Sequence, residues 1–246
     1  MGQLLVALDV ESGARALELA AMLDGVVDGV KIGSRLFTLE GPGLVRRLAA
    51  QGTRVFLDLK FHDIPNTVAQ AVEAAVSTGA WMVNVHACGG VPMMHAAARA
   101  AADAAAQLNR PKPVVIGVTV LTSMDEDTLR ACGVGRAVEE HVLALARMAH
   151  QAGLDGVVAS PQETAVIRAA CGPDFAIVTP GIRGASAGTE KNDQTRTMGP
   201  AEAVRAGANY LVVGRPIIAA ADPRSAAQRI VDEMRAAASP ESTTSP

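Results

Sequence analysis

The sequence predicts a single-domain α/β protein, a (β/α)8 or TIM barrel, and three observations point to this fold class. The chain has 246 residues, which is the usual length of one such barrel and too short for two large domains. It is 49% hydrophobic but only 2% aromatic, so Ala, Val, Leu and Ile must build its core, which suits parallel strands buried on both faces. Short β-rich runs alternate with Ala- and Leu-rich helical runs along the chain.

The β-rich runs number eight, and each is followed by a segment with helical patterning. We expect strands at 3–9, 27–32, 54–60, 81–86, 113–119, 155–159, 175–179 and 209–213. Amphipathic patterning predicts helices near 13–24, 41–51, 66–78, 91–107, 136–152, 161–171, 199–206 and 223–238. Glycine stands between helix and strand at Gly52, Gly79, Gly153 and Gly207, as expected of helix ends. A doubly wound sheet is the alternative, but no strand is followed by the GxGxxG pattern that would favour it.

The sequence predicts one folded domain followed by a short tail. We expect the catalytic barrel to cover residues 1–238 and the Ser-, Thr- and Pro-rich tail 239–246 to be disordered. The N-terminal segment has neither a basic region nor a long apolar run, so we expect no signal peptide. No apolar run approaches the length of a membrane span.

Charge and cysteine content limit the partners and the compartment. The net charge is −3, so there is no overall basic field for nucleic acid or anionic lipid, and any anion site must be local. The three cysteines, Cys88, Cys132 and Cys171, have neither CxxC nor metal-ligand spacing. This usage predicts a cytoplasmic protein with thiols as small apolar fillers.

Residues 56–67, Phe-Leu-Asp-Leu-Lys-Phe-His-Asp-Ile-Pro-Asn-Thr, are the most informative segment. Three charged side chains, Asp58, Lys60 and Asp63, come at the end of an apolar strand. Alternation along a strand places Asp58 and Lys60 on the same face, roughly 6–7 Å apart. Charges in a buried strand are costly unless they are paired, and a structural ion pair would need only two of them. The pattern therefore favours a preorganised charged site over an incidental ion pair.

Polar residues end several other strands. In a (β/α)8 barrel, the functional site lies at the carboxyl ends of the strands. The polar strand ends are Asp9, Lys31, Asn84, His86, Thr119, Thr122, Ser123 and Thr179. Acidic and basic residues on three consecutive strands, all at one end, are not what core packing alone would select.

A phosphate site is predicted after the last strand. Gly214 and Arg215 follow the apolar run 211–213 and open a short helix, where backbone N–H groups and a guanidinium can bind phosphate. An ordinary turn with a solvated arginine is the alternative. The loop at 181–199 is long for a βα connection, which favours a lid or substrate clamp, and Gln194 within it could reach a ligand.

The segment from Asp58 to Thr67 resembles the signature of the orotidine 5′-monophosphate decarboxylase family, and the resemblance covers about residues 3–235 in order. The motif after the third strand is highly specific, whereas Gly-Arg after the eighth is shared by many phosphate-binding barrels. Further matching landmarks are Val6-Ala-Leu-Asp9, Val30-Lys31-Ile-Gly, Val118-Thr-Val-Leu-Thr122-Ser, Thr179-Pro-Gly-Ile-Arg183, Asp193-Gln194 and Val213-Gly-Arg215.

The resemblance implies decarboxylation of orotidine 5′-monophosphate to UMP, the last step of de novo pyrimidine nucleotide biosynthesis, without cofactor or metal. Lys60 would protonate C6 of the pyrimidine, and Asp58 would lie beside the departing carboxylate. Lys31, Asp58, Lys60 and Asp63 would form an alternating set of charges, with Asp63 supplied by the second subunit of a homodimer. Substrate contacts would come from Asp9, Lys31, Asp63, Ile64, Thr67, Thr122, Pro180, Arg183, Gln194, Gly214 and Arg215, with Thr67 reaching across the interface.

Three alternatives remain open from the residues. A related phosphate-sugar decarboxylase, aldolase or epimerase could carry the same Asp-x-Lys-x-x-Asp pattern, and such enzymes often need a divalent metal. The five histidines are scattered, so we expect no metal cluster. A Schiff-base aldolase is less favoured, because flanking carboxylates keep Lys60 charged. A non-catalytic phosphate sensor would not need a buried charged set.

Overall fold

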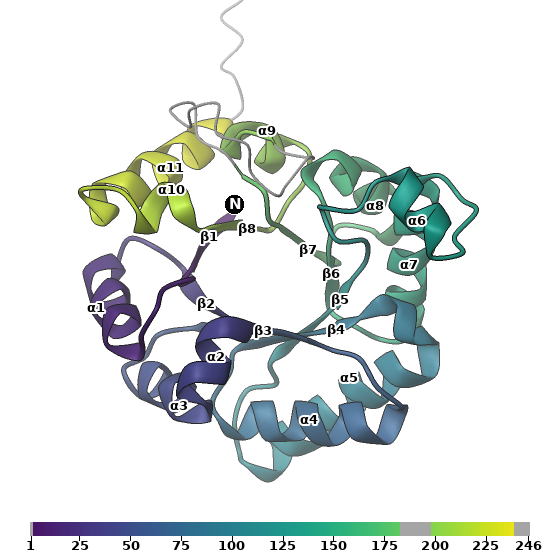
Figure 1. Ribbon diagram of the computed structural model, residues 1–246, viewed down its shortest axis with the longest axis horizontal. Helices are drawn as coiled ribbons and strands as arrows, with labels where there is room; N and C mark the ends of the chain where they lie inside the picture. The colour runs from purple at the N-terminus through teal and green to yellow at the C-terminus, as the bar shows by residue number, and fades with distance from the viewer. Residues whose placement is uncertain (1, 183–197, 239–246) are drawn as a thin grey trace, which may run out of the picture.

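The computed structural model, which describes residues 2–182 and 198–238, is a closed barrel of eight parallel strands surrounded by helices (Figure 1). Each strand pairs with its neighbour in the chain, and β8 closes the barrel on β1. The strands are β1 Gln3–Ala7, β2 Gly29–Gly33, β3 Val55–Phe61, β4 Met82–His86, β5 Val114–Val118, β6 Gly156–Val158, β7 Ala176–Thr179 and β8 Tyr210–Val213. All eight predicted strands are confirmed, with ends within two residues of those expected.

The predicted helices are also confirmed. They are α1 Gly13–Leu23, α3 Pro42–Ala50, α4 Pro65–Ser77, α5 Gly90–Gln107, α7 Val138–Gln151, α8 Thr164–Cys171, α9 Pro200–Arg205, α10 Arg215–Ile218 and α11 Pro223–Ala238, with 3-10 turns η1 Ala87–Gly89 and η2 Pro161–Glu163. Two further helices, α2 Ser34–Glu40 and α6 Glu126–Ala131, were not expected. Each buries a single side chain, Leu36 or Leu129, so neither leaves an amphipathic stripe in the sequence.

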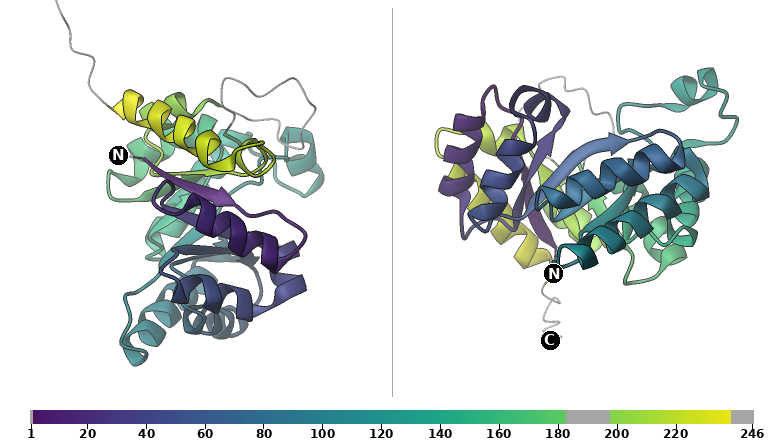
Figure 2. Two further views of the ribbon diagram at one scale, coloured as in Figure 1. Left: turned by 90° about the vertical axis from the view of Figure 1, so that its left-hand side faces the viewer. Right: turned by 90° about the horizontal axis from the view of Figure 1, so that it is seen from below.

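The segment that carries α6 stands out from the body of the barrel (Figure 2). The predicted tail, 239–246, lies outside the described residues. Among the helices of the described ranges, none is long and apolar enough to cross a bilayer.

Alternation along the strands divides the core into two layers. On β1, Leu4 and Val6 belong to the cluster that packs against the surrounding helices, whereas Leu5 and Ala7 belong to the smaller cluster inside the barrel. That interior cluster consists of Leu5, Ala7, Phe56, Met82, Ile116, Val178 and Val212. These apolar side chains fill the barrel beneath its carboxyl end, so polar groups above them rest on a packed support.

At the amino end of the barrel, three side chains just before even-numbered strands accept a backbone N–H from the preceding strand. Asp28 accepts from Leu4 at 2.8 Å, Asp155 from Val115 at 2.7 Å, and Asn209 from Ile177 at 2.9 Å. We call Asp28, Asp155 and Asn209 the amino-end clamps. Each has a cationic neighbour, and these are Arg54, Lys112 and Arg168 respectively.

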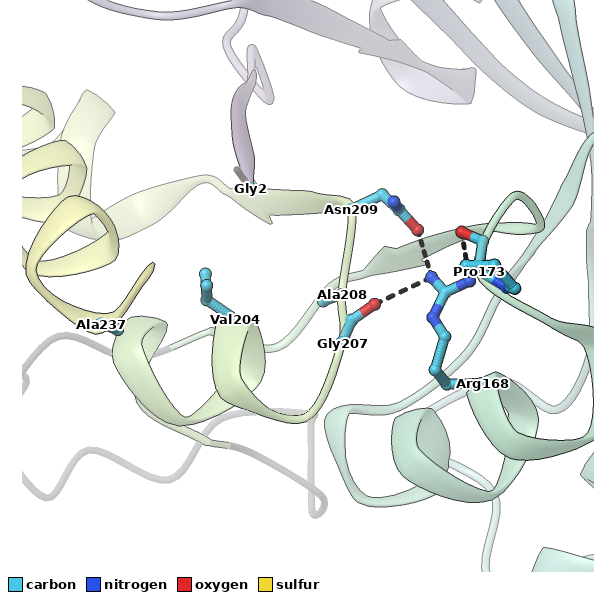
Figure 3. A pocket seen from close by; sticks show the side chains of 8 residues that line it. All are labelled: Gly2, Arg168, Pro173, Val204, Gly207, Ala208, Asn209 and Ala237. Carbon is cyan, nitrogen blue, oxygen red and sulfur yellow. Dashed lines mark hydrogen bonds between the residues drawn. The ribbon is translucent and has the colours of Figure 1, made fainter. Parts of the chain in front are cut away.

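The Arg168 guanidinium also donates to several backbone carbonyls between α8, β7 and β8, including those of Pro173 and Gly207 (Figure 3). The amino end is thus fixed by hydrogen bonds between neighbouring strands. This leaves the loops at the opposite end to build a site.

Candidate active site

Four charged side chains meet at the carboxyl end of β1, β2 and β3, and we call them the charged array: Asp9, Lys31, Asp58 and Lys60. The Lys31 Nζ lies 3.3 Å from an oxygen of Asp9 and 3.3 Å from Oδ2 of Asp58. The Lys60 Nζ lies 2.6 Å from Oδ1 of Asp58. Negative and positive groups therefore alternate along a continuous chain of contacts.

Strand register brings the charged array together. Ala7 of β1 pairs with Lys31, and Gly33 of β2 pairs with Asp58, so these side chains emerge at one level of the barrel. A side chain at Gly33 would begin 3.1 Å from the Lys31 ammonium. Glycine at this position therefore leaves the space that the ion pairs occupy.

The backbone at Lys60 is not that of a regular strand. Leu57 pairs with Val83 and Phe61 pairs with Val85, so residues 58–60 of β3 stand opposite one residue, Asn84 of β4. Lys60 has a φ of 53°, in the left-handed region that a lysine rarely adopts and that costs about 1–3 kcal/mol. The expected alternation of Asp58 and Lys60 along a regular strand is therefore wrong in detail. A bulge, rather than an even pleat, brings the ammonium onto the carboxylate.

Asn84 joins the two sides of this bulge. Its Oδ1 accepts the backbone N–H of Lys60 at 2.8 Å, and its Nδ2 donates to Oδ1 of Asp58 at 2.7 Å. The residue is fully buried. In the sequence, Asn84 is one of several polar strand ends, and nothing local to it indicates a role. Its role becomes clear only from its two hydrogen bonds across the bulge. A polar residue at an inward-facing strand position does, however, indicate that the residue has a specific partner.

The Asp58 carboxylate is ionised despite its burial. Desolvation acts to raise the pKa of Asp58, but the Lys31 and Lys60 ammonium groups and the hydrogen bonds from Lys60 and Asn84 outweigh it and hold that pKa below its usual range. Removing Lys31, the more enclosed of the two cations, would leave the buried charge of Asp58 incompletely compensated, which is destabilising. The charged array is thus a coupled unit.

Two histidines lie near the array, with ring centroids 5.6 Å apart: His62, which is exposed, and the half-buried His86. Burial, together with the positive potential of His62 and Lys60, lowers the pKa of His86. His86 is therefore neutral at neutral pH. Among the described residues, no group of three or more His, Cys, Asp or Glu side chains could hold a metal ion.

The segment after β3 faces solvent. Residues 62–67 are all exposed, and Ile64 has an exposed fraction of 67%. Asp63 makes no ion pair with the charged array of its own chain, and its carboxylate accepts the N–H of Ile64 at 2.6 Å. Within the described chain, the structure therefore joins Lys31, Asp58 and Lys60 to Asp9, and Asp63 forms no ion pair with them.

Other predicted residues lie on the loops at the same end of the barrel. Thr122 is in the turn after β5, and the half-exposed Pro180 directly follows β7. A side chain at Gly214, directly after β8, would begin 3.8 Å from Oδ2 of Asp9, so this turn adjoins the end of the charged array. The next residue, Arg215, is exposed and begins α10. A cationic residue thus directly follows the turn that adjoins the Asp9 end of the array.

A family model described as the orotidine 5′-phosphate decarboxylase / HUMPS family matches residues 2–230. The chain belongs to this family. The orotidine 5′-phosphate decarboxylase of Syntrophotalea carbinolica is 57% identical over 235 residues, which are 96% of each chain. That of Moorella thermoacetica is 54% identical over 233 residues, 94% of this chain and 92% of the other.

A solved structure supports the same grouping. The crystal structure of orotidine 5′-phosphate decarboxylase from Lactobacillus acidophilus has a TM-score of 0.84 and 36% identity, and the match covers 95% of this chain and 99% of that one. Membership of the orotidine 5′-phosphate decarboxylase family and the (β/α)8 fold are therefore both confirmed. Two of the residues that the resemblance assigned to substrate, Arg183 and Gln194, lie outside the described residues.

Proposed function

We propose that this protein converts orotidine 5′-monophosphate to UMP and carbon dioxide, using its own side chains and no cofactor. The observation that carries the proposal is the charged array, in which the Lys60 ammonium lies against a buried, ionised carboxylate. The identity of 57% to an orotidine 5′-phosphate decarboxylase over nearly the whole chain supports the same reaction.

Lys60 is the proton donor in this proposal. Breaking the bond between C6 and the carboxylate carbon releases carbon dioxide and leaves the electron pair on C6, where little delocalisation is available. A fixed ammonium at that position stabilises the developing charge more than it stabilises the bound substrate. Lys60 then transfers one proton from Nζ to C6, which gives UMP and a neutral amine that solvent reprotonates.

Asp58 has two tasks in this proposal. It holds the Lys60 ammonium, and its negative charge lies beside the substrate carboxylate before that group departs. Both oxygens of Asp58 already accept hydrogen bonds or ion pairs from Lys31, Lys60 and Asn84. Such a group has little freedom to reorganise when the reaction moves charge, which is the condition for electrostatic catalysis.

The remaining contacts bind the nucleotide. Asp9 and Lys31 are proposed to bind ribose hydroxyls and Thr122 to contact the pyrimidine ring, while Pro180 and Ile64 make further contacts with the substrate. Arg183, Gln194, Gly214 and Arg215 are proposed to bind the phosphate, with Gln194 linking phosphate to base. The adjacency of Gly214 to Asp9 supports a path from phosphate through ribose to the charged array. Binding energy gained at the phosphate can be used to orient the ring at Lys60.

A homodimer completes the site in this proposal, with the Asp63 and Thr67 side chains of one subunit reaching the active site of the other. The exposed segment 62–67 and its exposed apolar Ile64 support such an interface. We also propose that the enzyme acts in the cytoplasm, in keeping with three cysteines that form no disulfide.

The test is loss of the orotate ultraviolet band when purified protein meets orotidine 5′-monophosphate, with and without EDTA. We expect rapid loss that EDTA does not slow, with UMP as the product. Loss that EDTA abolishes would instead indicate a metal-dependent barrel enzyme. Complete absence of turnover would contradict the proposed function.

A further inference from the structure

We propose that Asn84 is the positioning residue for Lys60: its side-chain amide holds the backbone of residue 60 in the left-handed conformation and thereby aims the ammonium group. The inference rests on the proposed function, because it assigns Asn84 a part in the reaction that Lys60 would perform. Asn84 itself is fully buried and acts only through Lys60 and Asp58.

The bulge in β3 creates the need for this residue. Three residues, 58–60, stand opposite Asn84 where a regular parallel ladder would place one. The backbone N–H of Lys60 therefore meets the Asn84 side chain, at 2.8 Å, in place of a carbonyl of β4. A buried N–H without a partner is strongly disfavoured, so this hydrogen bond stabilises the bulged conformation over a regular one.

The same amide also fixes the other end of Lys60. Its Nδ2 donates to the Asp58 oxygen that receives the Lys60 ammonium, at 2.7 Å and 2.6 Å respectively. Asn84 thus contacts the backbone of Lys60 directly. It also acts on the Lys60 ammonium indirectly, because both groups donate to Oδ1 of Asp58. An amide suits this position because it offers an acceptor and a donor on one rigid plane.

Lysine does not adopt the left-handed conformation without support. Among the non-glycine residues of the described ranges, only Lys60 and Asn109 have positive φ, at 53° and 49°. Asparagine tolerates this conformation in turns, which accounts for Asn109. Lys60 has no such local reason. A strained backbone at a functional residue persists only when its surroundings impose it, and Asn84 is the side chain that bonds to it.

The experiment compares Asn84→Ala with a matched control, Asn209→Ala. Asn209 also accepts a backbone N–H, at 2.9 Å from Ile177, but at the amino end of the barrel. We expect Asn84→Ala to lower kcat by about 100-fold, because a misplacement on the order of 1 Å at a reacting group has that effect. We expect KM to stay within about fivefold, since phosphate and ribose contacts remain. Asn209→Ala should keep kcat within about threefold.

Two outcomes would overturn the proposal. One is an Asn84→Ala enzyme with kcat within about threefold of wild type. The other is equal loss of kcat in both variants in proportion to their loss of folded protein, which would make Asn84 merely structural. If Asn84→Ala does not fold, the isosteric Asn84→Asp keeps the acceptor for Lys60 but sets a carboxylate against Asp58. It should lower kcat with KM unchanged, and full activity in it would equally contradict the inference.

A crystal structure of Asn84→Ala separates this inference from the proposed function. We expect residue 60 to leave the left-handed region and Nζ to move away from Asp58. A Lys60 that keeps both features would refute the role of Asn84 even if the wild-type enzyme decarboxylates its substrate. Conversely, if the wild-type protein has no decarboxylase activity, the proposed function is wrong. The crystal structure of Asn84→Ala would still test whether Asn84 holds Lys60 in place.

Discussion

Lys60 and Lys31 both contact Asp58, but only one of them is accessible. The Lys31 side chain has an exposed fraction of 11%, against 34% for Lys60. Lys31 is enclosed between two carboxylates, whereas Lys60 contacts one carboxylate and is partly exposed to solvent. This asymmetry supports the proposal that Lys60 donates the proton and that Lys31 balances charge.

Replacing Lys60 with alanine should lower kcat at least about a thousandfold while the protein stays folded, because the variant lacks the group that we propose stabilises and protonates C6. Steady-state decarboxylation and circular dichroism measure the two effects. Lys112→Ala is the control, since its ammonium makes an equally short contact of 2.6 Å with Asp155 at the opposite end of the barrel. Near-normal turnover of Lys60→Ala would exclude Lys60 as the donor.

The lowered pKa of Asp58 predicts how stability depends on pH. An aspartate in the unfolded chain takes up its proton near pH 3.9, while the folded protein resists protonation to lower pH because Lys31 and Lys60 outweigh desolvation. The stabilisation is therefore fully present above about pH 3.9 and is lost as the pH falls through the folded pKa.

Urea unfolding of wild type and Asp58→Asn between about pH 5 and pH 3 measures this effect. The free energy of unfolding of wild type should fall more steeply with acidification than that of the variant. Parallel curves would show that Asp58 does not have a lowered pKa in the folded protein.

The sequence alone identified Asp58 and Lys60, because charges at the end of an apolar strand are conspicuous. It did not reveal the bulge, the left-handed Lys60 or the amide of Asn84. These depend on which residue of β4 faces residues 58–60, and that register is set by packing across 24 positions of sequence. The resemblance implied only that Asp9 contacts the substrate, whereas its contact with Lys31 follows from the register of β1 on β2.

The strands and the longer helices were predictable for the opposite reason. Their signals are local: alternating or continuous apolar runs, amphipathic stripes and glycines at helix ends. The short helices α2 and α6 lack such signals, since each buries one side chain. The amino-end clamps could not be predicted from the sequence either. An Asp or Asn before a strand is common, and the backbone N–H that it accepts lies on a different strand.

The clamp at Asp155 should contribute to stability and not to catalysis. Its Oδ2 accepts the N–H of Val115 at 2.7 Å, so Asp155→Ala leaves that donor without its partner and should lower the free energy of unfolding by about 1–3 kcal/mol. Asp127→Ala is the control, because Asp127 is almost fully exposed and forms a surface ion pair with Arg130. Denaturant unfolding and kcat measure the two effects, and a fall in kcat of the folded Asp155 variant would contradict this assignment.

Two copies of the whole molecule are needed if Asp63 serves the neighbouring site. Mixing inactive Lys60→Ala with inactive Asp63→Asn under conditions of subunit exchange should then restore activity. In a mixed dimer, one of the two sites has both wild-type residues, so random exchange should yield about one quarter of wild-type turnover. Each variant alone gives the background rate.

Sedimentation of the mixture shows whether dimers have formed. A fully active monomer, or a dimeric mixture that remains inactive, would contradict the shared site. Ile64→Asp is a further test of the interface, since a charge on the exposed apolar residue should weaken association.

The backbone conformation of Lys60 has an evolutionary consequence. Glycine would adopt a φ of 53° without strain, so at this position selection for folding and selection for turnover act in opposite directions. A lineage released from the need for turnover would be drawn toward glycine here. A descendant with glycine at position 60 and an intact interior cluster would be a stable but inactive barrel. Substitutions in its loops could then give it a different catalytic activity.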